Sequence, residues 1–430
     1  MTASPVIRKS GPPGDTPRLG ARFVLSFGFG YFGLWLGFLT PVMLVLQIRA
    51  EEIAPDSKSS TLSLVLGVGA VFGLLANPVA GRLSDRCTWR LGMRRPILLA
   101  GALLGFAGLL LVAVAGGVPM LVIGWSLAQI GCNAVLAALM ALMPDHVPQG
   151  ARGRVSGLLG VAQALAATAG ATVGGALSEV STAAAVLVPG SVMVVAVTVM
   201  CLTLRDRVLP AAERTPLNWG DLMRSFTFSP RRHPDFAWAW LSRFAIFMAI
   251  SAVLNYQLFY LTDQLGLVEG HATRIIPLGV MVQTVVVVAG SAVFGPLSDR
   301  TGRRKVFVIA AAGVAAAGLL VLALATALPI YFAGMVLIGL GQGIYFAVDM
   351  ALVTDVLPDR ERDAAKDLGV INVANLLPQS LAPAMAPVFL TIGFGTLSSE
   401  PGSNYLMLFA VGALFAVLSA VCIAPIRGVR

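Results

Sequence analysis

Two ionisable side chains lie well inside long apolar stretches of the sequence, where a charge is costly and tends to be functional. Arg243 follows the start of the stretch 236–262 by about seven residues, and Asp349 precedes the end of the stretch 328–354 by about six. If both stretches are helices that cross a membrane in opposite directions, both charges lie about 10 Å below the same membrane face. Three roles remain open for Arg243 and Asp349: a structural ion pair, a proton-coupling site, or a direct substrate contact. Arg243 could also extend to the lipid headgroups.

Uncharged polar side chains recur at helical spacing in other apolar stretches. Gln342, Tyr345 and Asp349 follow an i, i+3, i+7 pattern, and Asn372, Asn375 and Gln379 repeat it. Amides and aromatic rings on one cavity would suit a polyhydroxylated ligand, although the same groups could instead bond between helices at about 0.6 kcal/mol per contact. The candidate substrate-binding residues are Tyr31, Trp35, Gln129, Asn133, Gln163, Asn255, Tyr256, Tyr260, Gln342, Tyr345, Asn372, Asn375 and Gln379.

Other kinds of chemistry find little support in the sequence. The four cysteines and three histidines are scattered, whereas a metal site needs clustered ligands. We therefore expect no metal, no disulfide and no cofactor. We see no nucleophile–base pair either, so we do not expect an enzyme.

The composition indicates which elements must position these residues. Apolar residues make up 57% of the 430-residue chain and charged residues 12%, against roughly 25% charged in a soluble protein. This balance excludes a soluble globular enzyme, a disordered chain and a coiled coil. It predicts twelve membrane-spanning helices of about 20 residues or more. Their expected ranges are 23–48, 61–82, 96–116, 119–144, 155–178, 182–204, 236–262, 275–297, 306–326, 328–354, 368–393 and 403–425.

Orientation follows from the positions of Lys and Arg, which gather in cytoplasmic loops. With the N-terminus inside, 26 of the 30 basic residues fall on the cytoplasmic side, three fall outside, and Arg243 lies within a span. The net charge of +9 is therefore explained by topology and does not indicate nucleic-acid binding. We expect both termini to be cytoplasmic.

The fold class that we expect is an all-α membrane protein of two pseudo-symmetric six-helix halves. Residues 1–22 form a polar cytoplasmic N-terminal arm without the apolar core of a signal peptide. Residues 23–204 form the N-terminal half, 205–235 a cytoplasmic linker, and 236–430 the C-terminal half.

An internal repeat supports this division. The motif GRLSDR at 81–86 recurs as GPLSDR at 295–300, an offset of 214 residues. Asp145, with Pro148 and Arg152 after it, recurs as Asp355 with Pro358 and Arg362. Repeated six-helix halves are typical of secondary transporters, whose substrate site lies between the halves.

These repeated motifs carry a resemblance to a known family. The stretch 295–305, GPLSDRTGRRK, matches the signature loop of the major facilitator superfamily, and the resemblance covers the whole chain. The first copy differs because Asp85 to Gly92 is four residues longer than Asp299 to Gly302. That longer loop, SDRCTWRLGMRRP at 84–96, resembles the loop of sucrose–proton symporters and related glycoside transporters.

The resemblance implies roles for the repeated loops. In the family the signature loop is thought to latch the two halves in one alternating-access state, which would implicate Asp85 and Asp299. The other interpretation is topogenic charge with helix termination. The candidate gating residues are Gly81, Asp85, Arg86, Gly295, Asp299, Arg300, Arg303 and Arg304, and the candidate helix-end residues are Asp145, Arg152, Asp355 and Arg362.

The leading functional hypothesis is a secondary active transporter that moves a small polar solute, with a sugar or glycoside favoured, by alternating access and proton symport. The alternative is a proton-driven exporter of drug-like or secondary-metabolite compounds. A membrane sensor without transport is weaker because the second signature loop is intact. We expect the partners to be the solute, protons and the lipid bilayer, with no nucleic acid, and we expect a monomer in the cell membrane.

Overall fold

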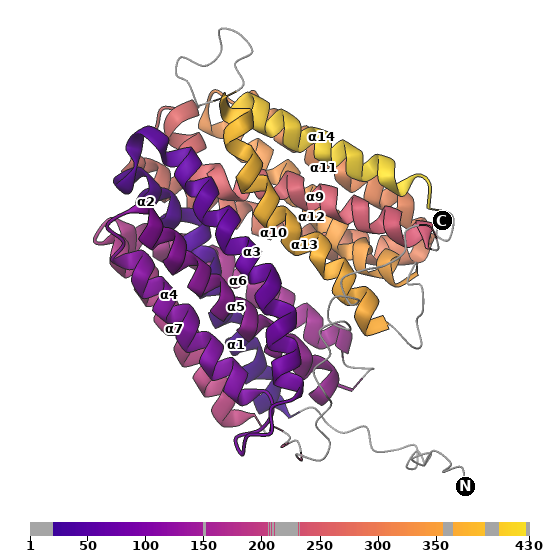
Figure 1. Cartoon of the computed structure of the whole chain (residues 1–430). Coiled ribbons are helices and arrows are strands. Elements are labelled where there is room, and N and C mark those ends of the chain that lie inside the picture. The colour runs from indigo at the N-terminus through magenta and orange to yellow at the C-terminus, as the bar shows by residue number, and fades with distance from the viewer. Residues whose placement is uncertain are drawn as a thin grey trace.

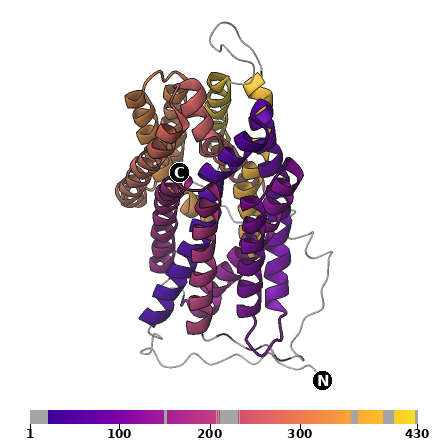
Figure 2. The ribbon, with the colours of Figure 1, turned by 90° about the vertical axis from the view of Figure 1, so that its left-hand side faces the viewer.

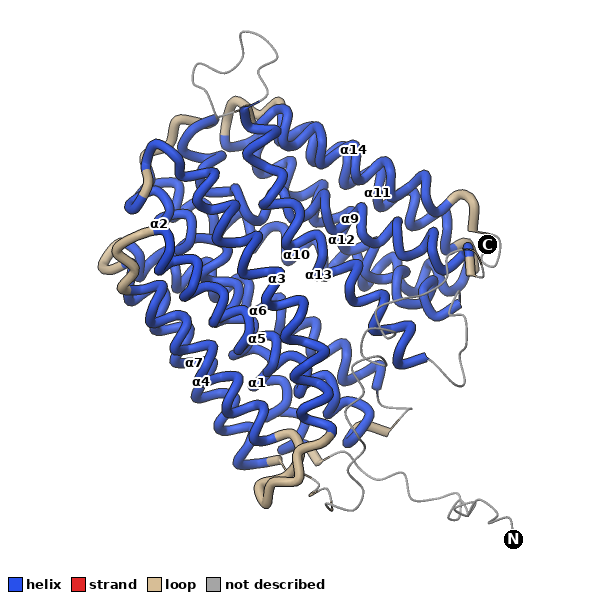
Figure 3. Tube along the Cα trace, viewed as in Figure 1, coloured by secondary structure: helices blue, strands red, loops and turns tan. Residues whose placement is uncertain are grey.

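The computed structural model describes residues 20–148, 152–204, 233–355, 364–391 and 404–426, together with 206, 208, 210 and 231. Helices joined by short loops make up nearly all of this part of the chain, and none of it forms a strand (Figure 3). Eleven of the helical segments are long and apolar enough to cross a membrane. The prediction of an all-helical membrane protein is confirmed at this level.

The helices fall into two groups along the chain. The first bundle consists of α1 (Ala21–Thr40), η1 (Pro41–Val45), α2 (Leu46–Ile53), η2 (Pro55–Ser57), α3 (Lys58–Asp85), α4 (Arg95–Ala113), α5 (Val118–His146), α6 (Arg152–Ser178) and α7 (Thr182–Thr203). The second bundle consists of α9 (Pro234–Phe259), η5 (Tyr260–Gln264), α10 (Glu269–Thr301), α11 (Arg304–Ala323), α12 (Leu328–Asp355), α13 (Ala364–Thr391) and α14 (Tyr405–Ile423).

The predicted span at 368–393, which forms helix α13 (Ala364–Thr391), is interrupted by prolines. Helix α13 is 28 residues long and carries three internal prolines, at 378, 383 and 387. Among its described side chains, the segment Leu381–Leu390 stands out as a shorter apolar helix. Each proline removes one backbone donor from the helix. The count of twelve crossings therefore stays a prediction.

Local sequence explains several helix ends. Proline occupies one of the first two positions of α4, α5 and α9, where its missing N–H costs nothing. Helix α10 ends at Gly302, whose φ of 62° lies in the left-handed region. A glycine is favoured at such a C-terminal cap because it lacks the Cβ that makes this conformation strained. Gly302 thus ends α10 inside the second signature loop.

Small residues allow close packing inside each bundle. A Cβ at Gly131 of α5 would lie 2.2 Å from the backbone nitrogen of Gly105 on α4. In the second bundle, a Cβ at Gly318 of α11 would lie 2.9 Å from the backbone nitrogen of Ile338 on α12. Helices in a membrane associate mainly through such close contacts, since lipid offers no hydrophobic driving force between them.

Within each bundle the helices pack in equivalent pairs. Helix α5 packs against α3 and α4, and α12 packs against α10 and α11. Helix α1 packs against α6 and α7, and α9 packs against α13 and α14. Between the bundles, α3 meets α13 and α6 meets α10. Figure 2 shows the helices of the first bundle running roughly side by side along the molecule.

The two bundles lie close together at the end that holds α2 and spread apart toward the other end (Figure 1). Near the close end, the helix continues past α1 and past α9 as a π-helical segment, η1 and η5 respectively. Proline at position 41 cannot donate a backbone bond, which favours the wider turn at η1. Gln47, which is fully buried just after η1, accepts a 3.0 Å hydrogen bond from the backbone N–H of Leu258 on α9.

A charged cluster also joins the bundles at this end. Lys58 of α3 lies 2.9 Å from the Oδ1 of Asp263 and 3.2 Å from Glu51. Tyr405 of α14 donates a 2.9 Å hydrogen bond to the other carboxylate oxygen of Asp263. The Lys58 ammonium also sits 4.9 Å from the ring centre of Phe259. We call Lys58, Glu51, Asp263 and Tyr405 the clasp.

A second ion pair between the bundles lies at the surface. Arg274 of α10 donates to Glu179, in the turn after α6, with an Nε–Oε1 distance of 2.6 Å. The hydrogen bond from Arg274 lowers the pKa of the Glu179 carboxyl below its ordinary value. Both groups are solvent-exposed, so this pair contributes little to stability. The clasp is the better candidate for holding the bundles together, because Lys58 and Asp263 are only 20% and 21% exposed.

We predict that Lys58→Met weakens this end of the interface. A partly exposed ion pair is worth up to about 1 kcal/mol, which shifts a two-state ratio roughly fivefold. The variant should therefore populate more of the state in which the opposite ends approach one another. Spin labels would be attached at positions 90 and 303 of a protein whose four native cysteines are replaced. Double electron–electron resonance would then measure the distance between the labels, and the fraction of short distances should increase. Lys58→Arg, which keeps the charge, is the control. An unchanged distance distribution in Lys58→Met would contradict a role for the clasp.

Candidate substrate and coupling site

The two charges singled out in the sequence meet in the second bundle. The Nη1 of Arg243 on α9 lies 2.7 Å from the Oδ2 of Asp349 on α12. The Nε of Arg243 donates a 2.6 Å hydrogen bond to the Oδ1 of Asn375 on α13. The guanidinium also lies 5.9 Å from the ring centre of Phe247, one turn further along α9. Three helices thus contribute to one polar cluster.

This cluster is shielded from its surroundings. The side chains of Arg243 and Asp349 are 10% and 7% exposed, and Tyr345, one turn before Asp349 on α12, is fully buried beside it. A buried charge is tolerated only when it is paired and hydrogen-bonded. Arg243 meets this condition through both the carboxylate of Asp349 and the amide of Asn375. Protonation of Asp349 would remove the opposite charge that Arg243 faces, while its neutral carboxyl oxygen and Asn375 could still accept hydrogen bonds.

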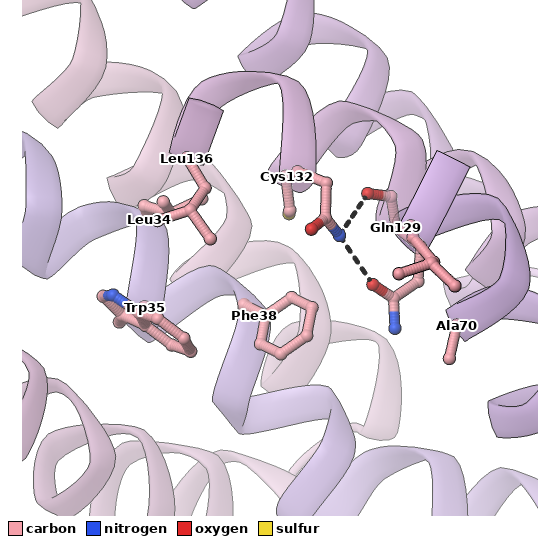
Figure 4. Close-up of a pocket in the computed structure, with 10 residues that line it drawn as sticks. Leu34, Trp35, Phe38, Ala70, Gln129, Cys132 and Leu136 are labelled. Atoms are coloured by element: carbon pink, nitrogen blue, oxygen red, sulfur yellow. Dashed lines mark hydrogen bonds between the residues drawn. The ribbon is translucent and has the colours of Figure 1, made fainter. Parts of the chain in front are cut away.

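A pocket in the first bundle contains a second group of predicted residues. It lies between α1, α3 and α5, and none of the residues that line it carries a charge at neutral pH (Figure 4). The lining residues are Leu34, Trp35, Phe38, Ala70, Gly73, Leu74, Gln129, Cys132, Asn133 and Leu136. Three of them, Trp35, Gln129 and Asn133, are candidate substrate-binding residues from the sequence.

The two amides in this pocket are bonded to one another. The Nδ2 of Asn133 donates to the Oε1 of Gln129 at 3.0 Å and to the backbone carbonyl of Gln129 at 2.9 Å. Because a backbone carbonyl only accepts, the nitrogen of Asn133 must be the atom that faces it. In this arrangement the amide nitrogen of Asn133 is the donor and the amide oxygen of Gln129 is an acceptor.

An aromatic row runs along α1 beside the pocket. The ring centres of Tyr31 and Trp35 are 6.0 Å apart, those of Trp35 and Phe38 are 5.7 Å apart, and Phe38 lies 5.8 Å from Trp125 of α5. The hydroxyl of Tyr31 donates a 3.5 Å hydrogen bond to the Oε1 of Gln163 on α6. The first bundle therefore offers a largely aromatic wall, whereas the charged cluster lies in the second bundle.

The remaining candidates mostly bond within or between helices. The hydroxyl of Tyr256 meets the Oγ of Ser63 across the bundles at 2.5 Å and also donates to the carbonyl of Pro383. Tyr260 donates to the carbonyl of Leu322 at 2.9 Å, and Gln342 accepts from Gln283 at 2.7 Å. Asn255 donates to the Ser251 carbonyl on its own helix. The side chains of Asn372 and Gln379 lie outside the described part of the structure.

The first signature loop is centred on an arginine that the sequence did not single out. Arg94, whose side chain is 5% exposed, pairs with Asp85 at the end of α3. It also pairs with Asp145 at the end of α5, at 2.9 Å, and donates to the Oγ of Ser84. In this state Asp85 therefore bonds within its own bundle, and the partner of Asp145 is Arg94.

Asp206, which follows the end of α7 by three residues, is bonded to the same loop. The Oδ2 of Asp206 accepts from the backbone N–H groups of Arg94 and Arg95, at 2.6 and 2.9 Å. The Asp206 carboxylate thus caps the start of α4, where a negative charge is favoured. Gly92, with a φ of 107°, leaves room for it, since a Cβ there would lie 2.3 Å from Asp206.

The second signature loop is only partly described. The side chains of Asp299, Arg152 and Asp355, and the whole of Arg362, lie outside the described part. The glycines of both loops pack alike: a Cβ at Gly81 would lie 4.0 Å from Ala137 on α5, and one at Gly295 would lie 3.7 Å from Ala347 on α12. Arg300 and Arg303 are exposed on the surface, and Arg86 and Arg304 are half-buried. The latch role of Asp85 and Asp299 stays a prediction.

Comparison with known proteins shows the family. The family model described as Major Facilitator Superfamily matches residues 19–287 and 271–429 in two overlapping stretches. The chain belongs to the Major Facilitator Superfamily. It is therefore a multi-pass membrane transporter and not an enzyme. The superfamily resemblance carried by the repeated loops is confirmed.

Several curated proteins are similar over part of their length. A general alpha-glucoside permease of Schizosaccharomyces pombe is 30% identical over 26% of this chain and 22% of its own. The human proton-associated sugar transporter A is 30% identical over 30% of this chain and 18% of its own. The match therefore spans about a fifth of the length of these relatives.

Two solved structures share the fold over nearly the whole chain. A bacterial homolog of the human lysosomal transporter Spinster, in an inward-facing and unoccupied conformation, superposes with a TM-score of 0.63 at 15% identity, covering 95% of both chains. The nucleoside transporter NupG superposes with a TM-score of 0.71 at 11% identity, covering 94% of this chain and 99% of its own. At these identities the likeness concerns the fold alone.

We predict that Asp349→Asn lowers the stability of the purified protein. The change leaves Arg243 charged and buried, still bonded to Asn375 but without the opposite charge of Asp349. Removing one member of a buried pair costs about 3–5 kcal/mol. The melting temperature should fall clearly. The double variant Asp349→Asn with Arg243→Gln should recover much of the loss because no unpaired charge remains. Equal melting temperatures for wild type and Asp349→Asn would mean that the Arg243–Asp349 pair does not stabilise the folded protein.

Proposed function

We propose that the protein is a proton-coupled secondary transporter that moves a small neutral polar solute, with sugars and glycosides first, across the cell membrane by alternating access. The observation that carries this proposal is the buried contact between Arg243 and Asp349. It joins a titratable carboxylate to a fixed positive charge, within one bundle of a transporter fold.

The proposed topology has twelve crossings, both termini in the cytoplasm, and two halves of six helices. The uneven distribution of Lys and Arg supports the orientation. The paired packing of α3, α4, α5 with α10, α11, α12 supports the two halves. We propose that α13 completes the count as a twelfth span, bent at its prolines, and that the protein acts as a monomer.

In this orientation the clasp lies at the extracellular end. Lys58 and Arg274 belong to the three basic residues that the topology places outside. The close approach of the bundles there, and their divergence at the other end (Figure 1), support an inward-facing state. Opening to the outside would then require the clasp to break.

The coupling step that we propose is a change of partners around Arg243. When Asp349 is ionised, it holds the guanidinium together with Asn375. When Asp349 takes up a proton, its attraction to Arg243 is lost, while Asn375 keeps one hydrogen bond to the guanidinium. Helix α12 is then released from α9, and this makes the relative position of these helices depend on protonation.

Two features support a neutral, hydroxyl-bearing solute. The pocket in the first bundle combines an amide pair with aromatic rings and has no charge. The curated relatives are described as an alpha-glucoside permease and a proton-associated sugar transporter. Rings stack on the C–H faces of sugars, and amides bond to their hydroxyls.

One observation favours a second candidate, a proton-driven exporter of drug-like compounds. Most of the pocket lining is apolar or aromatic, which is typical of sites for hydrophobic ligands. The direction of transport separates the two candidates: an importer accumulates solute along an inward proton gradient, whereas an exporter expels it.

We predict that the double variant Asp349→Asn with Arg243→Gln cannot use a proton gradient. Wild-type proteoliposomes should accumulate labelled methyl α-glucoside when the outside is more acidic. The double variant should show no such accumulation, because its amides at positions 243 and 349 cannot titrate. It should still exchange labelled for unlabelled solute, since exchange needs no proton cycle.

The matched control for this experiment is Asp56→Asn, which removes an exposed carboxylate far from the cluster along the sequence. It should accumulate solute like the wild type. Gradient-driven accumulation by the double variant at the wild-type level would remove Asp349 from the coupling mechanism.

A further inference from the structure

The amide pair in the first bundle leaves one donor group and one acceptor without a partner. Both N–H groups of Asn133 are used by Gln129, through its side-chain oxygen and its backbone carbonyl. The Oδ1 of Asn133 and the NH₂ of Gln129 make no hydrogen bond within the described residues. Both side chains are only 6% exposed, and both line the pocket (Figure 4).

Glycine 73 holds this pair in place. A Cβ at position 73 would lie 2.7 Å from the Nδ2 of Asn133 and 2.9 Å from the Oε1 of Gln129. These are the two atoms that bond to each other, so any side chain at position 73 would push the pair apart. One turn earlier, Gly69 seats the indole of Trp125 in the same way, with a hypothetical Cβ 2.4 Å from its Cδ1. Gly69 and Gly73 therefore give α3 a flat surface, and the amide side chains of α5 pack against it.

The chemistry of the pocket narrows what can bind there. Its acceptor and its donor lie on adjacent turns of α5, and its aromatic wall comes from Trp35 and Phe38. The ten lining residues include no carboxylate, lysine or arginine, so a charged group would be desolvated there without compensation. Two neighbouring hydroxyls match this arrangement because one can donate to Asn133 while the other accepts from Gln129.

We propose that Gln129 and Asn133, seated on Gly73, form a subsite for a pair of adjacent ring hydroxyls of a neutral pyranoside. Trp35 and Phe38 cover the apolar face of that ring. The subsite rests on the proposed function, and it names Gly73 as a positioning residue. Recognition of the ring then lies in the first bundle, while the proton site lies in the second.

The test measures binding by isothermal titration calorimetry to purified protein. The probes are methyl α-glucoside and its four monodeoxy analogues, three lacking one ring hydroxyl each and the fourth lacking the hydroxyl of the exocyclic CH₂OH group. Wild type should bind methyl α-glucoside and lose about tenfold in affinity for the two analogues that lack the adjacent hydroxyls. In Gln129→Met, the loss for one of those two analogues should disappear, because the partner of that hydroxyl is already gone.

Two glycine variants separate positioning from folding. Gly73→Ala should weaken methyl α-glucoside binding about tenfold or more and flatten the preference among the analogues. Gly160→Ala, on α6, is the matched control, since a Cβ there meets nothing within 4 Å. A general loss of stability would instead weaken all five ligands equally and leave their order unchanged, which would overturn the proposal.

The outcomes also separate this subsite from the proposed function. Wild-type binding of methyl α-glucoside, with the wild-type order of analogues retained in both Gln129→Met and Gly73→Ala, would overturn the subsite alone. Failure of wild type to bind any of the glucosides would overturn the sugar assignment and the subsite with it.

Discussion

A charged arginine and a charged aspartate can be buried among apolar helices only as partners, and this constraint organises the second bundle. The contact between Arg243 and Asp349 fixes α9 against α12, and Asn375 adds α13 through the same guanidinium. The proposed coupling step relies on this contact, because a proton on Asp349 would take away the opposite charge that Arg243 faces.

The first bundle is built on the opposite principle. Its tight contacts come from glycines, as at Gly105 and Gly131, and its pocket is lined by neutral side chains. Two bundles with different interiors suit a transporter in which solute recognition and proton binding are separate chemical tasks. The clasp around Lys58 and Asp263 joins the bundles at the end where they lie close together.

Hydropathy was enough to predict the helices. The equal depth of Arg243 and Asp349 below one membrane face was enough to suggest that these two residues meet. Contacts between residues far apart in the sequence leave no such periodic signal. Arg94 was visible only as one of several loop arginines, yet it bonds to both Asp85 and Asp145. The contact of Gly73 with the amide pair depends on how α3 and α5 pack, which the sequence does not reveal. Asn375, a candidate solute ligand, bonds to Arg243 in this structure, and its role in solute binding stays a prediction.

The most direct measurement is of proton movement caused by the solute alone. Wild-type proteoliposomes with a pH-sensitive dye inside, no imposed pH gradient and a clamped membrane potential would receive methyl α-glucoside from outside. A proton-coupled importer should acidify the lumen as the glucoside enters, and the double variant Asp349→Asn with Arg243→Gln should not. Entry of the glucoside into wild-type vesicles without any change of internal pH would contradict coupling through the Arg243–Asp349 pair.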